Sequence, residues 1–188
     1  PQNLQNLAGY PKHKKILERM RKEHLRYAKE IRDWGFVPEY ESWEMSKGAS
    51  GWKVARSGTI NWHKIIDEAE QVGRAEPTVL IQNLKSENAS LRYWGAIGLG
   101  ALENGLTKSS IMALKKALED SSPSVRIEAA NALIRNGKAE PALPVLIGEL
   151  DHQNLIVVTH AARTIELLGE LAKKALPAMK ACLKRAYA

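Results

Sequence analysis

The sequence predicts an all-α fold, an α-solenoid of helical hairpins that is preceded by a long amphipathic helix and an irregular connector. Apolar residues recur at helical spacing near the N-terminus, a glycine- and serine-rich stretch follows, and the rest of the chain repeats one apolar pattern. We therefore divide the chain into a first helical segment (residues 1–37), a connector (38–60) and a helical-repeat domain (61–188).

Length and composition allow a folded core, since the chain has 188 residues and 44% of them are hydrophobic. The single cysteine, Cys182, cannot form an internal disulfide, so cysteine usage does not indicate a compartment. No apolar run approaches the roughly 18 residues of a membrane span, and we expect no membrane partner. Residues 1–30 contain no stretch like a signal peptide, but the chain begins with Pro1, so its localisation stays open.

The net charge of +7 is unevenly distributed. Residues 1–37 carry nine Lys and Arg against four Asp and Glu, and residues 77–188 carry fourteen against ten. A positive surface of this kind attracts nucleic acid, anionic glycans or acidic protein surfaces. The favoured interpretation is an ordinary solvated face.

Residues 12–34 are predicted to form one amphipathic helix of about six turns. We expect Gly35 to close the helix in the left-handed conformation, Phe36 to fold back onto Ile31, and Pro38 to stop any continuation. A lone helix cannot cover its own apolar stripe, so we expect part of the covering partner to lie outside this chain. The stripe consists of Ile16, Leu17, Met20, Tyr27, Ala28, Ile31 and Trp34.

The connector, residues 38–60, has three glycines, four serines and no sustained period. Because flexible linkers rarely contain tryptophan, Trp43 and Trp52 predict that it lies pinned against the rest of the fold. A short helix follows at "NWHKIIDEAEQV", with Asn61 or Thr59 as its cap.

From residue 77 onward the chain repeats itself, because Leu80 to Leu114 is a step of 34 residues and Leu114 to Leu146 a step of 32. Each unit predicts a helical hairpin, and stacking buries faces that no single hairpin can bury. Small alanines on the second helices allow close packing. A partial fourth copy begins at Met179. The residues expected to be buried are Leu84, Leu118, Leu150, Ala96, Ala130 and Ala162.

The segments "SLRYWGAIGL" and "SVRIEAANAL" resemble the second helix of HEAT repeats, in which an arginine follows the apolar anchor. Here the arginines are Arg92 and Arg126. The resemblance covers residues 77–188 and implies an architecture rather than an activity.

No catalytic, cofactor-binding or metal-ligating residue is predicted. The five histidines are scattered without a metal-binding spacing, and the closely spaced glycines of "GAIGLG" lie in a repeat helix rather than a phosphate loop. Cys182 fits the apolar pattern of the last helix better than the role of a nucleophile. We expect this chain to have no activity of its own and no bound cofactor.

Residues 1–39 resemble the C-terminal end of the sulfatase family, in which an Asp-Pro-x-Glu-x-x-Asn-Leu segment precedes a long helix. In many bacterial members that helix ends with Gly-aromatic/aliphatic-x-Pro-Glu. Pro1, Asn6, Leu7 and Ala8 match the first segment, "ILERMR" the helix start and "RDWGFVPE" its end, whereas Asn3 replaces the usual Glu. The family's formylglycine motif, Cys/Ser-x-Pro-x-Arg, and its calcium-binding aspartates are absent from this chain, so no active-site residue corresponds.

The resemblance implies a non-catalytic C-terminal fragment of a bacterial sulfatase. Its repeats would have a structural or interaction role, the missing catalytic domain would be its partner, and its location would be periplasmic or exported. One alternative is an independent HEAT-like scaffold for protein partners. A basic nucleic-acid-binding solenoid is less favoured, because the aromatics needed for base stacking are concentrated before the repeats.

Four residues are candidates for a ligand or partner surface: Arg92, Arg126, Trp43 and Trp52. Arginines near exposed indoles could hold an anionic glycan, since cations attract sulfate and indole faces stack on sugar rings. The competing interpretation is structural, with each arginine paired to a carboxylate of the next hairpin and each tryptophan filling a groove.

Overall fold

The computed structural model describes residues 6–186, with only the backbone of Ala186, and over this range the chain forms helices and no strand. The predicted all-α fold is confirmed. The sequence also allows one short extended piece near residues 1–8, and most of that segment lies outside the described residues. The α-helices are α1 (Lys14–Ile31), α2 (Glu39–Met45), α3 (Gly51–Arg56), α4 (Trp62–Glu70), α5 (Pro77–Asn83), α6 (Ala89–Gly100), α7 (Lys108–Ala117), α8 (Pro123–Arg135), α9 (Ala139–Glu149), α10 (Leu155–Leu168) and α11 (Leu176–Ala186). The 3-10 helices are η1 (Pro11–His13), η2 (Trp34–Phe36) and η3 (Gly169–Ala175).

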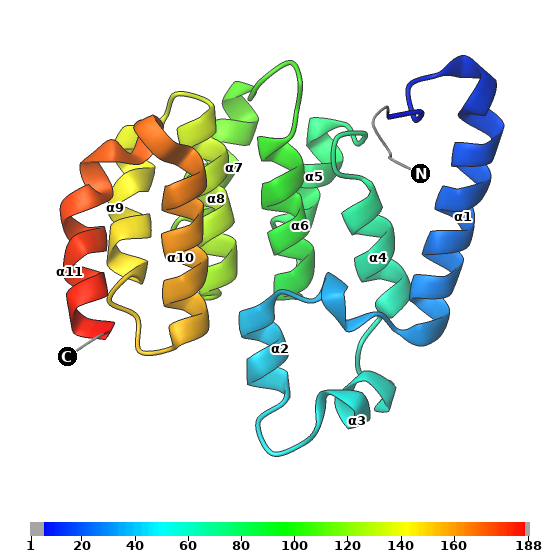
Figure 1. Cartoon of the computed structure of the whole chain (residues 1–188), viewed down its shortest axis with the longest axis horizontal. Helices are drawn as coiled ribbons and strands as arrows, with labels where there is room; N and C mark the ends of the chain where they lie inside the picture. Colours follow the sequence, from blue (N-terminus) through cyan, green and yellow to red (C-terminus); the bar gives the residue numbers. More distant parts are fainter. Residues whose placement is uncertain (1–5, 187–188) are drawn as a thin grey trace.

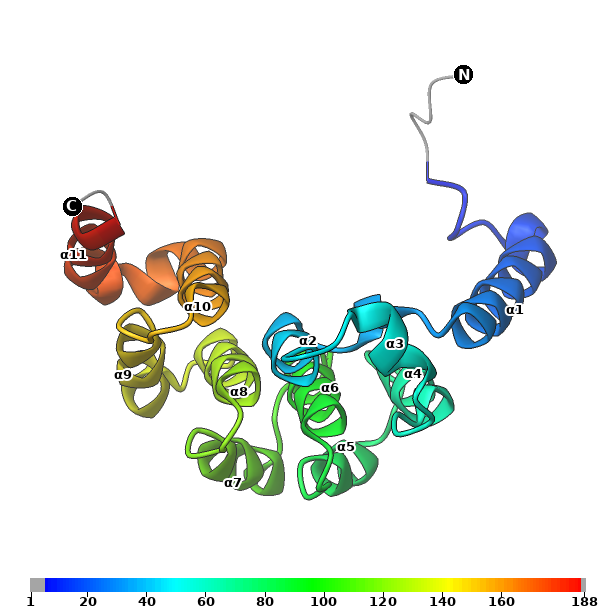
Figure 2. The same cartoon turned by 90° about the horizontal axis from the view of Figure 1, so that it is seen from below.

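The hairpins α5–α6, α7–α8 and α9–α10 stack side by side into a curved solenoid (Figure 1). Figure 2 shows the arc end-on, with α6, α8 and α10 along the concave side and α5 and α7 on the convex side. The helix α11 follows at the place of the first helix of a repeat, as the partial fourth copy predicts. Each hairpin buries its apolar face against its neighbours, so the core runs along the whole arc.

The burial of the anchor residues agrees with the repeat alignment. Ala96 and Ala130 are fully buried, and Leu118 and Leu150 are 9% and 2% exposed. Leu84 and Ala162 are only partly buried, although both pack against the same core. In the third hairpin the fully buried alanine is Ala161, one residue before the predicted position.

Close packing between the two helices of the first hairpin depends on glycine. A Cβ on Gly95 would lie 2.9 Å from the carbonyl oxygen of Leu80 and 3.0 Å from the Cβ of Asn83. Any larger residue would therefore push α6 away from α5. The "GAIGLG" stretch serves packing, as its position in a repeat helix predicts.

Local capping explains where the second helices begin. Asn88, Ser122 and Asn154 are the N-caps of α6, α8 and α10, and each side-chain oxygen accepts a hydrogen bond from a backbone N–H of the first turn. The cap of α4 is Asn61, not Thr59, and its side chain accepts from the N–H of Lys64 at 3.1 Å.

The end of α1 differs from the prediction. The left-handed residue is Arg32, with φ of 57°, and the helix stops before Gly35. Asp33 instead caps η2 by accepting from the N–H of Gly35 at 3.0 Å, which starts a new turn in place of a glycine C-cap. Phe36 lies beside Trp94, with ring centroids 6.3 Å apart, and packs against the smaller core, which includes Ala28 of α1.

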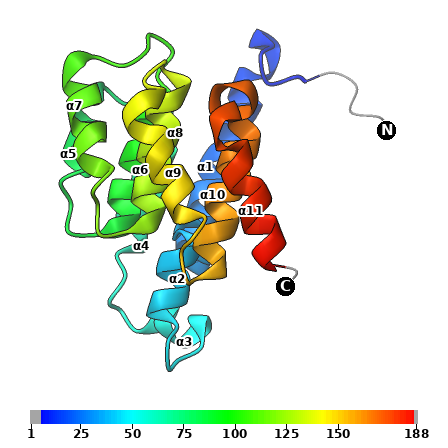
Figure 3. The same cartoon turned by 90° about the vertical axis from the view of Figure 1, so that its left-hand side faces the viewer.

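The connector is less irregular than predicted, because it contains α2 and α3. Both are shorter than two turns, so neither leaves a recognisable period in the sequence. Two acidic residues in the first turn of α2 suit the positive end of the helix dipole, and Ser50 caps α3. Figures 1 and 3 show α2 and α3 below the hairpins, beyond the lower ends of their helices.

A second, smaller core joins the N-terminal part of the chain to the solenoid. It combines the end of α1, the connector, α4 and α6. The indole N–H of Trp62 donates to the carbonyl of Ala55 at 3.0 Å, and that of Trp94 to the carbonyl of Phe36 at 2.9 Å. The buried members are Ala28, Val37, Ala55, Trp62, Ile65, Ile66 and Leu91.

Candidate interaction surfaces

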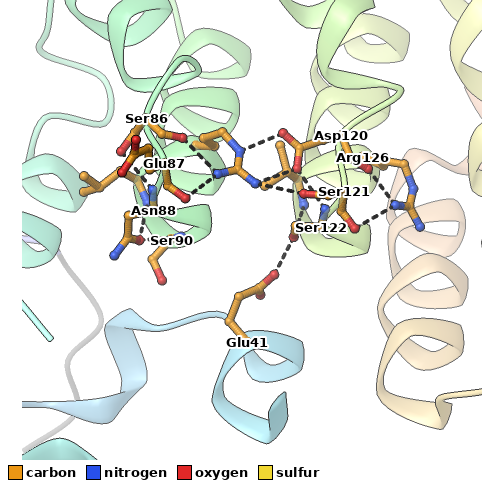
Figure 4. Close-up of polar contacts among 12 residues, drawn as sticks. Glu41, Ser86, Glu87, Asn88, Ser90, Asp120, Ser121, Ser122 and Arg126 are labelled. Atoms are coloured by element: carbon orange, nitrogen blue, oxygen red, sulfur yellow. Dashed lines mark hydrogen bonds and ion pairs between the residues drawn. The ribbon is translucent and has the colours of Figure 1, made fainter. Parts of the chain in front are cut away.

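The two predicted arginines join neighbouring hairpins. Arg92 in α6 donates from Nε and Nη2 to the two carboxylate oxygens of Asp120, at 2.7 and 2.8 Å, and Asp120 lies in the turn before α8. Its Nη1 donates to the carbonyls of Ser86 and Glu87, both at 2.9 Å. The planar guanidinium therefore connects two turns at once, and Figure 4 shows these contacts.

Arg126 repeats this arrangement one hairpin further along. Its Nε donates to Glu149 at 2.6 Å and its Nη1 to the carbonyl of Asp120 at 2.7 Å. The two arginine side chains are only 13% and 22% exposed. Both guanidinium groups are thus bound to protein acceptors, in register as the repeat spacing predicts.

The electrostatics of Asp120 follow from these contacts. Burial by itself would raise the pKa of its carboxyl, but hydrogen bonds from Arg92 and from the N–H of Ser122, together with the charges of Arg92 and Arg126, outweigh it and lower the pKa. The pKa of Arg92 is raised, chiefly by its hydrogen bond to Asp120. The pair stays charged at neutral pH.

Glu41 on α2 is a buried carboxylate that the sequence analysis did not single out. It is 8% exposed, and its Oε1 accepts a hydrogen bond from the hydroxyl of Ser122, the N-cap of α8 (Figure 4). Its Oε2 is buried and has no partner among the described residues. The start of α8 favours a negative charge, which explains why α2 docks here.

The connector is pinned against the fold as predicted, because Glu41 and Ala55 are buried, but Trp43 and Trp52 themselves are exposed. Trp43 in α2 is 43% exposed and Trp52 in α3 is 66% exposed. Each carries a cation over its ring, since Lys47 Nζ lies 4.0 Å from the Trp43 centroid and the Arg56 guanidinium 4.4 Å from that of Trp52. Among the described residues neither indole makes a hydrogen bond or ring contact with Arg92 or Arg126, so the four predicted residues do not form one site.

The concave face carries a polar network that sequence reasoning missed. Glu128 in α8, 9% exposed, bonds His160 Nε2 of α10 at 2.9 Å and accepts from Asn131 Nδ2 at 3.0 Å. Tyr93 of α6 lies beside His160, with ring centroids 6.3 Å apart. Burial raises the pKa of the Tyr93 phenol, and the charge of Glu128 adds to the effect. Tyr93 and His160 also line a cavity of 410 Å³ on this face.

The described residues contain no group of three or more His, Cys, Asp and Glu side chains placed to hold a metal ion. None of the described helices combines the length and the apolar character of a membrane span. Cys182 is half-buried and packs against the main core.

The repeats identify the architecture. Residues 77–166 match the family model of HEAT repeats. This HEAT-repeat segment begins at the first residue of α5 and ends within α10, so it contains the three stacked hairpins. The search of curated proteins gave no significant match, and neither did the search of solved structures. The chain is a HEAT-like α-solenoid, a helical-repeat scaffold of the kind that generally mediates protein interactions.

Proposed function

We propose that this chain is a non-catalytic HEAT-like module of a bacterial sulfatase, and that it docks on the sulfatase catalytic domain through α1. The observation that carries the proposal is the exposed apolar stripe of α1. Residues 1–39, which include α1, are also the residues that resemble the end of the sulfatase family.

Within the described part of the chain, α1 packs against the fold mainly through its C-terminal half. Ala28 is buried, Leu25 packs against the smaller core, and Lys29 pairs with Asp67 of α4. Towards the start of the helix, Ile16 and Met20 are 47% and 62% exposed. No described residue buries this end of the stripe, and an apolar helix face of this kind indicates a partner.

The same face continues through Tyr27 and Ile31, which are 57% and 41% exposed. Tyr27 lies 11 residues beyond Ile16, and Ile31 lies 11 residues beyond Met20. Because 11 residues make about three helical turns, all four side chains share one side of the helix. A folded domain immediately before α1 in the chain would be the nearest surface able to cover them. A periplasmic or exported location would follow from this parent enzyme.

The first test is to read the gene upstream of Pro1. The proposal expects a Cys/Ser-x-Pro-x-Arg motif and calcium-binding aspartates there, and their absence would contradict it. The second test mixes the separately produced catalytic domain with this chain. Met20→Asp should abolish binding, whereas Met112→Asp, at a methionine of α7 that is 72% exposed, should not.

The module is proposed to have no activity of its own. Purified residues 1–188 should not hydrolyse a chromogenic aryl sulfate with calcium present. Aryl sulfate hydrolysis that co-purifies with the chain and is lost in the Cys182→Ala variant would overturn this part of the proposal.

A second candidate function, an independent scaffold for protein partners, is favoured by the concave face. The network of Glu128, His160 and Asn131 crosses two helices next to a cavity, which is a suitable surface for a polypeptide. A gene that begins near Pro1 would favour this candidate. Nucleic-acid binding has less support, because Arg92 and Arg126 are already paired with carboxylates.

A further inference from the structure

A depression of 620 Å³ lies between α2 and the start of α10. Tyr40, Trp43 and Lys47 line it on the α2 side, and His152, Gln153 and Asn154 line it on the other. The two walls come from distant segments, because Lys47 and His152 are 105 residues apart in the sequence. The helices α2 and α10 are in direct contact. Tertiary packing therefore builds the depression.

The wall on α2 is aromatic. The rings of Tyr40 and Trp43 have centroids 6.2 Å apart and planes inclined by only 31°. His152 stands edge-on to Tyr40, with centroids 6.0 Å apart and an angle of 85°. Trp43 is 43% exposed and lies outside both hydrophobic clusters, although its helix is docked on the solenoid. The ammonium of Lys47 lies over one face of its ring, so a ligand stacks on the other face or displaces Lys47.

The opposite wall supplies hydrogen-bonding groups. Asn154 caps α10 by accepting from the N–H of Ile156 at 2.8 Å, and its Nδ2 is buried without a partner among the described residues. This nitrogen is closed to solvent, so a ligand in the depression does not reach it. Gln153 is exposed at the same wall, and its side-chain amide supplies both a donor and an acceptor that a ligand can reach.

The charge of the depression excludes a strongly anionic ligand. The ammonium of Lys47 is bound to both carboxylate oxygens of Glu44, at 2.9 and 2.8 Å, so the two charges compensate each other. The arginines that could hold a polyanion, Arg92 and Arg126, are paired elsewhere. An uncharged ligand with one apolar face and many hydroxyls fits aromatic and amide walls together.

We propose that this depression binds a sugar residue of a neutral glycan, whose C–H face stacks on Trp43 and whose hydroxyls form hydrogen bonds with the side-chain amide of Gln153. The site goes beyond the proposed function and does not depend on it, since an upstream gene without a sulfatase motif would leave these walls unchanged. It also replaces the anionic glycan of the sequence analysis by an uncharged one.

The test titrates the full chain with neutral tetrasaccharides of glucose, galactose, mannose and xylose, using NMR shifts to follow binding. At least one should bind, and Trp43→Ala should weaken that binding by about tenfold or more, the loss expected when a stacking ring is removed. Trp43→Tyr should retain most of it. Trp52→Ala is the matched control, because Trp52 is even more exposed than Trp43 and also lies beneath a cation, but lines no part of the depression.

Gln153→Ala separates ligand binding from helix capping. It removes the exposed amide and leaves the Asn154 cap of α10 in place, so the thermal midpoint should not fall while sugar binding weakens. Binding of no tetrasaccharide, or equal losses in Trp43→Ala and Trp52→Ala, would overturn the proposal. Heparin that binds more tightly than every neutral sugar, and loses affinity with salt and with Trp43→Ala, would overturn the assignment to an uncharged ligand.

Discussion

Arg92 and Asp120 form a two-pronged ion pair that joins the first hairpin to the second, with N–O distances of 2.7 and 2.8 Å. Their side chains are 13% and 12% exposed, so water screens the pair little. Arg92 also binds the carbonyls of Ser86 and Glu87. It therefore holds the turn between α5 and α6 against the turn between α7 and α8. The angle between successive hairpins therefore depends on charge as well as on apolar packing.

Removing one partner of this pair should strongly destabilise the fold. Asp120→Ala leaves the Arg92 guanidinium buried and unpaired, and the free energy of unfolding should fall by about 3 kcal/mol. Chemical denaturation of both single variants and the double variant gives the coupling energy, and the double variant should lose less than the sum. Arg163 and Glu166, 60% and 64% exposed, provide the control, whose coupling should stay below about 1 kcal/mol. Equal coupling in the two pairs would contradict this account.

Acid should weaken the same contact. The pKa of Asp120 is lower in the folded chain than its unfolded value of about 4, so its stabilisation is complete above that value and is lost as pH falls through the folded pKa. In Asp120→Asn the free energy of unfolding should fall less steeply below about pH 4. Urea titrations at a series of pH values measure this. Parallel curves for the variant and the unmodified chain would show that Asp120 does not contribute.

Two leucines that the repeat alignment makes equivalent should lose different amounts of stability on replacement by alanine, because only one of them is buried. Leu118 is 9% exposed, and Leu118→Ala should lower the free energy of unfolding by about 2–5 kcal/mol. Leu183 occupies the corresponding position in α11 but is 59% exposed, so Leu183→Ala should change it by less than about 0.5 kcal/mol. Thermal and chemical denaturation of both variants are the measurement. A small loss at Leu118 would argue against the packing of the second hairpin.

Two helical glycines should respond to alanine with opposite signs. Gly148→Ala meets nothing within 4 Å and should stabilise α9 by about 0.5–1 kcal/mol through a less flexible unfolded chain. Gly95→Ala places a Cβ 2.9 Å from the Leu80 carbonyl oxygen and should destabilise by about 1–3 kcal/mol. Denaturation midpoints decide the signs. Stabilisation by Gly95→Ala would mean that α5 and α6 separate at little cost.

Local periodicity made much of the architecture predictable. The anchors around Leu114 and Leu146 recur because every hairpin must bury the same face, and Asn61 caps α4 because its side chain reaches the next N–H groups. Local signals were weaker where an element is short. The connector helices α2 and α3 leave no period, and at the end of α1 the sequence favours Gly35 although Arg32 takes the left-handed conformation.

The sequence by itself determined the helical hairpins, their register and the equivalence of Arg92 and Arg126. Only the tertiary structure decided what those arginines bind, that Glu41 is buried against Ser122, and that Trp43 faces the turn before α10. The physical reason is the separation in sequence between the residues that interact. A helix is encoded by neighbours three or four residues apart, whereas a side chain's partner is 28 residues away for Arg92 and 81 for Glu41. Stacking of the hairpins and docking of α2 bring such partners together.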